Sequence, residues 1–238
     1  MIKSINSWER VLKPNGYKIV EWNENNWDIH QNNFALESYQ AKKYAYTSDI
    51  IRLDVLNRFG GVYLDTDMVV NKPLDPFLTL HAFWSMQFSN AISTSIIGSE
   101  PNNPFLEYLL NKYDSYSFSM IQQGKIPETN NEIITKALID YYPEFRLTNA
   151  KQTLADNTLI FPKEFFVFPS FHKKMDYTDH LFTKTWGHDN YSKLHYIVKN
   201  ITHSLVGDVI FGKISSYRGQ KKFLANNKYY EEIKKNNQ

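Results

Sequence analysis

The feature that most constrains this chain is a long segment without glycine or proline that stops at a Gly-Gly pair. Residues 33–59 contain neither residue, so we predict one or two helices there. The second part has one broad apolar helical face, formed by Ile50, Ile51, Leu53, Val55 and Leu56. Gly60-Gly61 predicts the end of the helix, because glycine readily adopts the left-handed conformation that closes one. The following residues, VYLDTDMVV, read as a buried strand.

The rest of the chain alternates between short apolar runs and helical patterns. We predict strands at 17–22, 83–88, 93–99 and 158–162, and helices at 103–113 and 131–142. This interleaving favours an α/β architecture, and no linker divides residues 1–238, so a single domain is expected. A later stripe at helical spacing is expected to pack in the core: Leu194, Ile197, Val198, Ile201, Leu205 and Val209.

Composition excludes several classes of protein. There is no cysteine, which rules out disulfides and thiolate metal sites, and a net charge of +2 is too small to argue for nucleic acid as a partner. The first residues lack the apolar core of a signal peptide, and no apolar run reaches the length of a membrane span, so we expect a soluble cytoplasmic protein. Residues 213–238 carry seven Lys/Arg against two Glu; this basic C-terminal tail is either a solvated end or a contact with an anionic membrane surface.

Two acids, Asp65 and Asp67, stand one residue apart at the end of the apolar run. In a strand they would share a face, and at the carboxyl end of a strand in an α/β sheet they would lie where ligands usually bind. Their oxygens suit Mg²⁺ or Mn²⁺, which commonly bridge protein carboxylates and substrate phosphates. The alternative is a polar turn before NKPLDP with no ligand.

Two chemistries use such a pair of acids. A haloacid-dehalogenase-type phosphatase would need a second acid pair, but after Gly207-Asp208 the required position holds Gly212. Nucleotide-sugar chemistry would use the acids to hold a divalent ion against a diphosphate. Upstream, Asp49 and Arg52 lie at helical spacing i, i+3 and face one direction, which favours this chemistry only in combination with the acids, because on its own the spacing indicates a local ion pair on the helix surface.

Taken together, the motifs resemble glycosyltransferase family 32, the sugar transferases with an Asp-x-Asp motif that include fungal mannosyltransferases and large glucosylating bacterial toxins. The matching residues are Ser48-Asp49-x-x-Arg52, Gly60-Gly61-x-Tyr63-x-Asp65-x-Asp67 and Lys72-Pro73-Leu74, with a weaker match at HLFTKTW (180–186). The segments 17–28 and 41–56 also read like bacterial capsule and exopolysaccharide members. The resemblance is dense from Ser4 to Pro76 and implies a GT-A-type nucleotide-diphospho-sugar transferase fold, with a mixed central sheet flanked by helices.

The resemblance also implies roles for single residues. Asp67 would bind Mn²⁺ or Mg²⁺ directly, and Asp65 would contact the ribose or sugar and reach the metal through water. Asp49 and Arg52 would hold donor-sugar hydroxyls, and Tyr63 belongs to the same nucleotide-sugar site. Thr185 and Trp186 would close over the diphosphate. His180 matches the family's first histidine in its segment, but Leu181 replaces the second, so both a ligand and a structural role stay open.

The implied reaction is transfer of a hexose from a nucleotide sugar, UDP-linked, to a saccharide or lipid-linked saccharide, with retention of configuration, in polysaccharide biosynthesis. The family's usual opening strand, Ile-Pro-Lys-x-Ile-His-x-x-Trp, is missing before the segment at which this sequence begins. Losing a central strand would remove part of the base pocket, so we expect weak nucleotide binding and low activity. A truncated transferase that serves as a binding or scaffold protein therefore stays open as an alternative.

Overall fold

The computed structural model describes residues 2–172, 174–183 and 193–226, with only the backbone described for 193–206 and 224–226. The helices and strands are, in chain order, α1 (Ile2–Val11), α2 (Asn33–Gln40), α3 (Tyr44–Phe59), β1 (Gly61–Leu64), β2 (Met68–Val70), β3 (Ala82–Phe88), β4 (Ala91–Ser99), α4 (Pro104–Asp114), α5 (Phe118–Gln122), α6 (Asn130–Tyr141), β5 (Gln152–Thr153), β6 (Leu159–Phe161), β7 (Thr178–His180) and α7 (Lys193–Asn226). Short 3-10 helices lie at Lys13–Asn15, Ile29–Gln31 and Asp75–Phe77.

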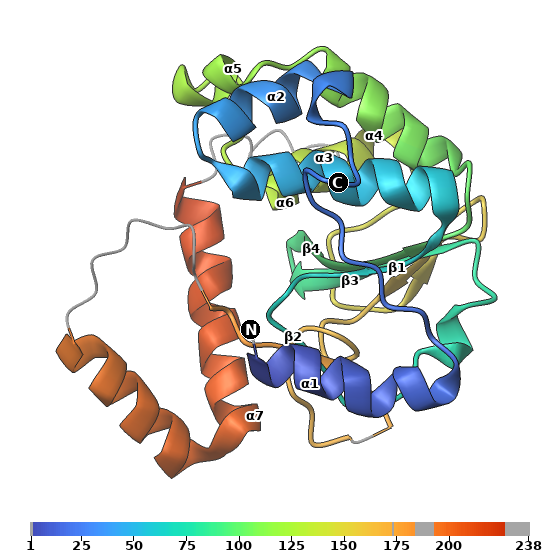
Figure 1. The fold of residues 1–238 in the computed structure, drawn as a ribbon. Coiled ribbons are helices and arrows are strands. Elements are labelled where there is room, and N and C mark those ends of the chain that lie inside the picture. The colour runs from blue at the N-terminus through green and yellow to red at the C-terminus, as the bar shows by residue number, and fades with distance from the viewer. Residues whose placement is uncertain (1, 173, 184–192, 227–238) are drawn as a thin grey trace.

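A mixed five-stranded sheet forms the centre, in the order β1-β4-β3-β6-β5. Strands β3 and β6 are parallel, and the other neighbours are antiparallel. Helices α2 to α6 cover one face of this sheet, while α1 and a separate antiparallel pair, β2 and β7, lie on the other (Figure 1). The expected α/β fold with a mixed central sheet between helices is therefore confirmed.

The two faces of the sheet build two apolar cores. Successive side chains of a strand point to opposite faces, so Trp84 and Met86 of β3 pack among the helices while Phe83 packs toward α1 and β2. In β4, Ile97 likewise packs among the helices, while Ile96 packs toward α1 and β2. Because both faces are covered, β3 and β4 are buried along nearly their whole length, which explains their continuously apolar sequences.

Helix α3 ends where the sequence predicted, and the reason is steric. Gly60 has φ of +66°, and its N–H donates to the carbonyl of Leu56 at 2.8 Å. A Cβ at this position would lie 2.8 Å from the Pro101 side chain and 3.0 Å from the Ser99 carbonyl oxygen. Only glycine therefore permits both the left-handed conformation and the close approach of the chain to the end of β4.

Several expected elements are confirmed, and two are wrong. The strands expected at 83–88, 93–99 and 158–162 correspond to β3, β4 and β6, and the helices expected at 103–113 and 131–142 to α4 and α6. Residues 17–22, however, do not form a buried strand: they are extended but unpaired with any described strand, and Lys18 to Glu21 are exposed. This segment is held at its ends instead, where Trp22 stacks on Phe59 with ring centroids 5.4 Å apart.

The run VYLDTDMVV is likewise not one strand. It breaks at Asp65, and its two halves, β1 and β2, join different sheets. Only β2 is fully buried, because β1 is an edge strand of the central sheet as far as the described residues show. The turn that replaces the middle of the run carries both acids.

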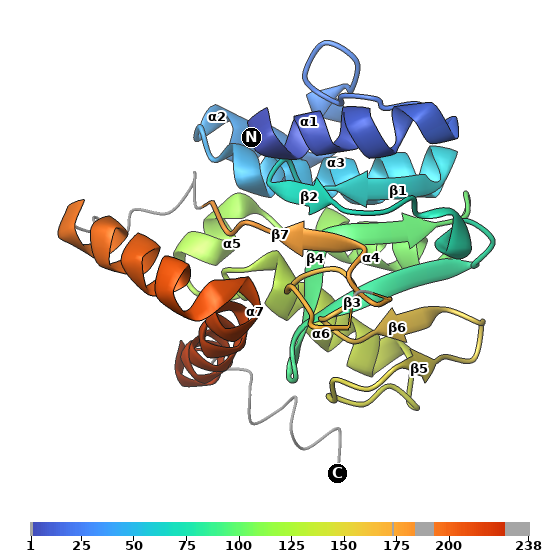
Figure 2. The same ribbon diagram turned by 90° about the horizontal axis from the view of Figure 1, so that it is seen from below.

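Helix α7 consists of two helical pieces that meet at Gly207, whose φ of 75° and ψ of 161° are not helical. Figure 2 shows it beside the end of the sheet where β7 also lies. The apolar stripe expected between 194 and 209 falls outside the described side chains except for Val209, which lines a surface pocket. Among the helices that the structure describes, none is both long enough and apolar enough to cross a membrane.

Candidate active site

The two acids of the Asp-x-Asp motif lie in the tight turn between β1 and β2. The N–H of Asp65 donates to the Ser95 carbonyl of β4 at 2.9 Å. The N–H of Met68 donates to the Asp65 carbonyl, also at 2.9 Å. The chain thus leaves the central sheet at Asp65 and enters the smaller sheet three residues later. Such a turn holds both carboxylates at the end of a strand.

Arg52 connects helix α3 to this turn. Its Nη2 lies 2.9 Å from Asp49 Oδ1, and its Nη1 lies 3.3 Å from Asp65 Oδ1. Nη1 also donates to the Thr94 carbonyl at 2.6 Å, and Nε donates to the Ser48 carbonyl at 3.3 Å. Only 5% of Arg52 is exposed, so these partners must satisfy the guanidinium in place of water. The pair Asp49–Arg52 and the pair Asp65–Asp67 therefore meet at one place.

Burial governs the electrostatics of this cluster. Burial raises the pKa of Asp49 to about 6, because the attraction of Arg52 offsets only part of the desolvation of its carboxylate. Burial alone would lower the pKa of Arg52, but Tyr63, Asp65 and Asp49 around it raise that pKa above its ordinary value. Arg52 is consequently a permanent cation, while Asp49 titrates close to neutrality.

Tyr63 of β1 completes the cluster. Its hydroxyl donates to Asp65 Oδ1 at 2.8 Å, and Arg52 Cζ lies 4.6 Å from the centroid of its ring. Burial raises the pKa of Tyr63 well above its ordinary value, so the phenol stays a neutral donor. One oxygen of Asp65 is thus fixed by Tyr63 and Arg52 together.

Asp67 is held from the opposite side by the segment that follows β7. His180 Nε2 lies 3.0 Å from Asp67 Oδ1, and both the N–H and the hydroxyl of Thr183 donate to Oδ2 at 2.9 Å. The pairing of β2 with β7 sets this geometry, because Met68 stands opposite His180 in the register. Burial would raise the pKa of Asp67, but His180 and the Thr183 donors outweigh it and lower that pKa. Asp67 is therefore a stable anion.

Asp65, Asp67 and His180 form a group that could hold a metal ion. Each offers one ligand atom, and these three atoms all lie within 4.8 Å of one another. Two carboxylate oxygens and one imidazole nitrogen are a donor set that suits Mn²⁺, while carboxylates with water suit Mg²⁺. The Nδ1 atom of His180 is buried without a hydrogen-bond partner in the described structure, so Nε2 is the ring nitrogen that faces the carboxylates. The residues present fit a divalent cation.

The sequence analysis singled out most of this cluster. Six of the residues that it named converge: Asp49, Arg52, Tyr63, Asp65, Asp67 and His180. Thr185 and Trp186 lie outside the described residues. Thr183, which donates twice to Asp67, was missed although it belongs to the quoted segment HLFTKTW; a hydroxyl residue three positions after His180 was the available signal. The carbonyl of Thr94 was also missed, because no side-chain pattern marks a backbone acceptor.

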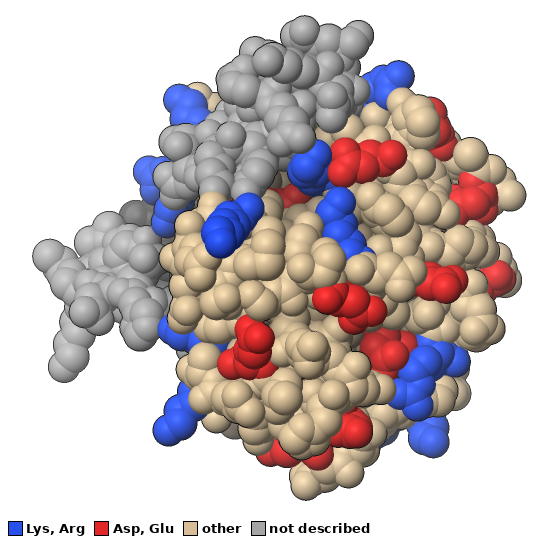
Figure 3. Space-filling model, turned by 90° about the horizontal axis from the view of Figure 1, so that it is seen from above, with Lys and Arg blue, Asp and Glu red and all other residues tan. Residues whose placement is uncertain are grey.

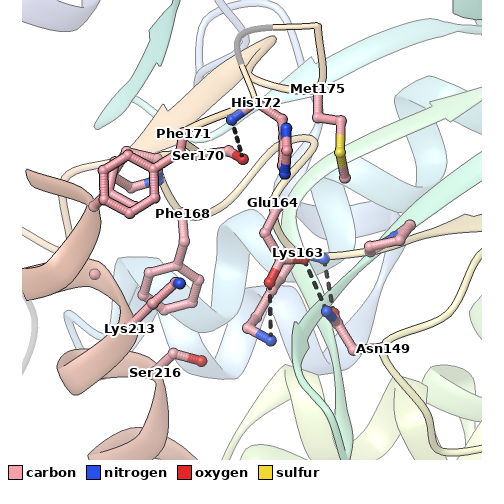
Figure 4. Close-up of a pocket in the computed structure, with 14 residues that line it drawn as sticks. Asn149, Lys163, Glu164, Phe168, Ser170, Phe171, His172, Met175, Lys213 and Ser216 are labelled. Carbon is pink, nitrogen blue, oxygen red and sulfur yellow. Dashed lines mark hydrogen bonds and ion pairs between the residues drawn. The ribbon is translucent and has the colours of Figure 1, made fainter.

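A pocket of about 410 Å³ opens near the cluster, between the loop after β6 and the second piece of α7 (Figure 4). Phe168 is one of its lining residues, and Lys163 and Glu164 contribute an ion pair at 3.3 Å. Aromatic rings connect the pocket to the acids: the Phe168 ring lies 5.1 Å from that of Phe182, which lies 4.1 Å from the imidazole of His180. The rings of Phe168 and Phe182 thus lie between the pocket and His180.

Comparisons with known proteins agree with the motif and the geometry. Residues 1–84 match the family described as a glycosyltransferase sugar-binding region containing the DXD motif. An uncharacterized glycosyltransferase, L373, of Acanthamoeba polyphaga mimivirus is 32% identical over 167 residues, which cover 65% of this chain and 64% of that protein. Mannosyl phosphorylinositol ceramide synthase SUR1 of Saccharomyces cerevisiae is 37% identical over 87 residues, which cover 35% of this chain and 23% of that protein.

Two further proteins are similar to parts of this chain. A human alpha-1,4-N-acetylglucosaminyltransferase is 30% identical over 82 residues, which cover 34% of this chain and 23% of that protein. The solved structure of the PaToxG glycosyltransferase is 26% identical, covers 48% of this chain and 42% of its own, and gives a TM-score of 0.37. The matched regions thus cover less than two thirds of the length of each of these proteins. Residues 1–84 are therefore similar to a glycosyltransferase sugar-binding region, and Asp65-Thr66-Asp67 corresponds to the DXD motif of that description.

Proposed function

We propose that this chain transfers a hexose from a nucleotide sugar, UDP-linked and with retention of configuration, to a saccharide or lipid-linked saccharide in polysaccharide biosynthesis. The observation that carries the proposal is the meeting of the buried Asp49–Arg52 pair with Asp65 beside the Asp65–Asp67–His180 group. The guanidinium of Arg52 thus lies beside a group that could hold a metal ion. This arrangement would suit a donor that has a sugar at one end and a diphosphate at the other. We also assign the chain to family 32 with a GT-A-type fold, and place it in the cytoplasm.

Asp67 and His180 would hold the metal ion, with Asp65 at its edge. When bound, a divalent cation supplies charge neutralisation to a departing diphosphate. Thr183 has a positioning role, because its two donors to Oδ2 of Asp67 leave Oδ1 turned toward His180. Burial of Asp67, whose side chain is 14% exposed, keeps the anion out of bulk water and strengthens its attraction for a cation.

The donor sugar would lie against the carboxylates that Arg52 orders. The side chain of Asp65 is 28% exposed and that of Asp49 13%, against 6% for Arg52 itself. Hydroxyl groups of a sugar can therefore reach the two carboxylates, while Arg52 fixes their orientation from behind. In this proposal Arg52 acts through Asp49 and Asp65 more than through direct contact with the donor.

Metal-dependent turnover of nucleotide sugars tests the proposal. The purified chain is incubated with UDP-hexoses and Mn²⁺, and release of UDP is measured for the wild type and for Asp67→Ala. We expect release that needs Mn²⁺ and is lost in Asp67→Ala. Asp54→Asn is the matched control: it lies on α3 as Asp49 does, but its carboxylate accepts from Trp27 and Arg58, so its activity should be that of the wild type.

The alternatives give different results in the same assay. A pure binding protein would leave every donor intact while still shifting its melting temperature with UDP and Mn²⁺. A phosphatase would release phosphate from small phosphoesters and ignore nucleotide sugars. Full activity in Asp67→Ala would contradict the metal role.

A further inference from the structure

Small side chains let the second piece of helix α7 approach the protein closely. Gly212 and Ser216 are buried, and they lie four residues apart on one helical face. Gly219 continues that face, and a Cβ there would lie 2.4 Å from the ring of Phe88 in β3. The close approach of the helix to the sheet edge thus depends on small residues.

The opposite face of this helical piece carries three exposed apolar side chains. Ile210, Ile214 and Tyr217 are exposed by 46%, 37% and 60%, and their spacing of i, i+4 and i+7 makes them one stripe. A surface helix of a soluble domain ordinarily buries such a stripe and exposes polar residues. Phe223 follows that rule, because its ring lies 6.4 Å from that of Phe88 in β3, but the outward stripe does not, so the stripe is available to a partner.

A fourth exposed apolar residue borders the stripe. Phe171, on the loop that faces α7, is 65% exposed, and Lys213 Nζ lies 5.5 Å from the centroid of its ring (Figure 4). We call Phe171, Ile210, Ile214 and Tyr217 the α7 apolar patch. Because Lys213 lies between Ile210 and Ile214 in the sequence of the helix, its contact with Phe171 joins the loop to the stripe.

Cations flank the patch. The exposed residues Lys213, Arg218, Lys221 and Lys222 lie on the same helical piece, where Asp208 is the one acid between 208 and 226. Lys221 Nζ lies 4.7 Å from the centroid of the Tyr217 ring, so its charge lies directly beside the α7 apolar patch. The face that carries α2 and α4 differs, because there acids and bases are interspersed (Figure 3).

We propose that this patch docks on an anionic lipid bilayer, with α7 lying in the plane of the headgroups. An outward apolar stripe with lysines and arginine beside it is the pattern of an interfacial helix, whose side chains enter the boundary between headgroups and acyl chains. Long cationic side chains attract anionic headgroups, while tyrosine and phenylalanine suit the interface itself. An acidic protein partner would account for the cations but not for the exposed apolar stripe that they flank.

The position of the α7 apolar patch bears on the acceptor of the proposed transferase. This inference about the acceptor rests on that proposed function. Phe171, Val209 and Lys213 also line the 410 Å³ pocket, whose Phe168 leads through Phe182 to His180. A bilayer at the patch would therefore lie beside this pocket. The pocket in turn connects, through the rings of Phe168 and Phe182, to His180 of the candidate metal group. This favours the lipid-linked acceptor over a free saccharide.

Vesicle binding tests the proposal without any donor or acceptor. The chain is sedimented with phosphatidylcholine vesicles and with vesicles that also contain phosphatidylserine. We expect binding to the anionic vesicles that weakens as salt is added, and roughly tenfold weaker binding for Ile210→Gln/Ile214→Gln/Tyr217→Gln. Glutamine keeps helix propensity, and circular dichroism checks the fold of the variant.

The matched control removes exposed apolar side chains elsewhere. Ile19→Gln/Val20→Gln changes two residues that are 36% and 46% exposed but lie far along the chain from α7, and its binding should equal that of the wild type. Equal binding by the α7 variant, or no preference of the wild type for anionic vesicles, would overturn the proposal. So would a wild-type dimer in solution that the α7 substitutions dissociate, since the patch would then be a contact between copies. None of these results depends on whether the chain turns over nucleotide sugars.

Discussion

The guanidinium of Arg52 lies 3.3 Å from the carboxylate of Asp65, and this contact joins helix α3 to the turn that carries the Asp-x-Asp motif. The two residues come from different elements, and Arg52 is buried beneath the more exposed Asp65. The same guanidinium holds Asp49, so a single cation orders two carboxylates. Stability and function are therefore coupled at this position.

Replacing Arg52 with methionine should destabilise the protein strongly. The substitution leaves Asp49 and Asp65 without their cation, and breaking a buried pair by removing one partner costs about 3–5 kcal/mol. Urea unfolding measures the loss. Arg58→Met is the control, because its pair with Asp54 lies on the surface of the same helix and contributes at most about 1 kcal/mol. Equal losses in the two variants would show that the Arg52 cluster is not a buried ionic unit.

The stability of the protein should depend on pH through Asp49. Its pKa of about 6 lies above the ordinary value of 3.8, so between these values the folded state binds more protons than the unfolded state. The free energy of unfolding therefore falls as pH rises through this window, by an amount on the order of 3 kcal/mol.

A comparison with Asp49→Asn isolates that contribution, because asparagine does not titrate. The wild type should lose stability relative to the variant as pH rises from roughly 4 to roughly 7, as measured by urea unfolding at each pH. A difference between the two proteins that stays constant with pH would mean that Asp49 ionises as easily in the folded state as in the unfolded one, and a change in the opposite direction would mean that it ionises more easily in the folded state.

The sequence predicted the site better than it predicted the local structure around it. The resemblance of the linked motifs to family 32 brought Asp49, Arg52, Asp65 and Asp67 together in the hypothesis, and the structure places them together. The i, i+3 spacing alone indicated only a local ion pair. What periodicity could not show is that VYLDTDMVV divides between two sheets, because one long strand and two short ones have similar apolar content. The partner of β2 is β7, more than a hundred residues later, and such pairing leaves no local signal.

Residues 17–22 show the opposite failure. Their apolar and β-branched side chains favour a strand, but a strand needs a neighbour, and none of the described strands pairs with them. The exposed Ile19 and Val20 follow from that missing partner. Propensity alone therefore indicated a conformation, which is indeed extended, and not the burial that was inferred with it.

Gly60→Ala should be far more harmful than Gly16→Ala. Both glycines have positive φ, of 66° at Gly60 and 83° at Gly16. Alanine costs about 1 kcal/mol in the left-handed conformation of Gly16, and about 1–3 kcal/mol at Gly60, whose ψ of −165° belongs to a region that essentially only glycine adopts. At Gly16 a Cβ meets nothing within 4 Å, whereas at Gly60 it would lie 2.8 Å from Pro101. We expect an additional loss of about 1–3 kcal/mol at Gly60, measured by thermal or urea unfolding. Equal losses would show that the approach of Pro101 is not tight.

Mn²⁺ should stabilise the folded protein through Asp67 and His180. A ligand that binds only the folded state adds about 3 kcal/mol at roughly a hundred times its dissociation constant, which thermal unfolding detects as a rise in melting temperature. Asp67→Ala should abolish the rise and His180→Ala should reduce it, because both offer a ligand atom to the same group.

His81→Ala is the control for the loss of a histidine, since His81 lies beside Glu100 and Asp156 instead of the motif. Its response to Mn²⁺ should match that of the wild type, and chelation with EDTA should return every protein to its own metal-free melting temperature. If His180→Ala keeps the full rise, the imidazole is a structural partner of Asp67 and the ion is held by the carboxylates alone. If Asp67→Ala keeps it as well, the cation binds somewhere else, and the acids of the turn serve the packing of Arg52 and His180.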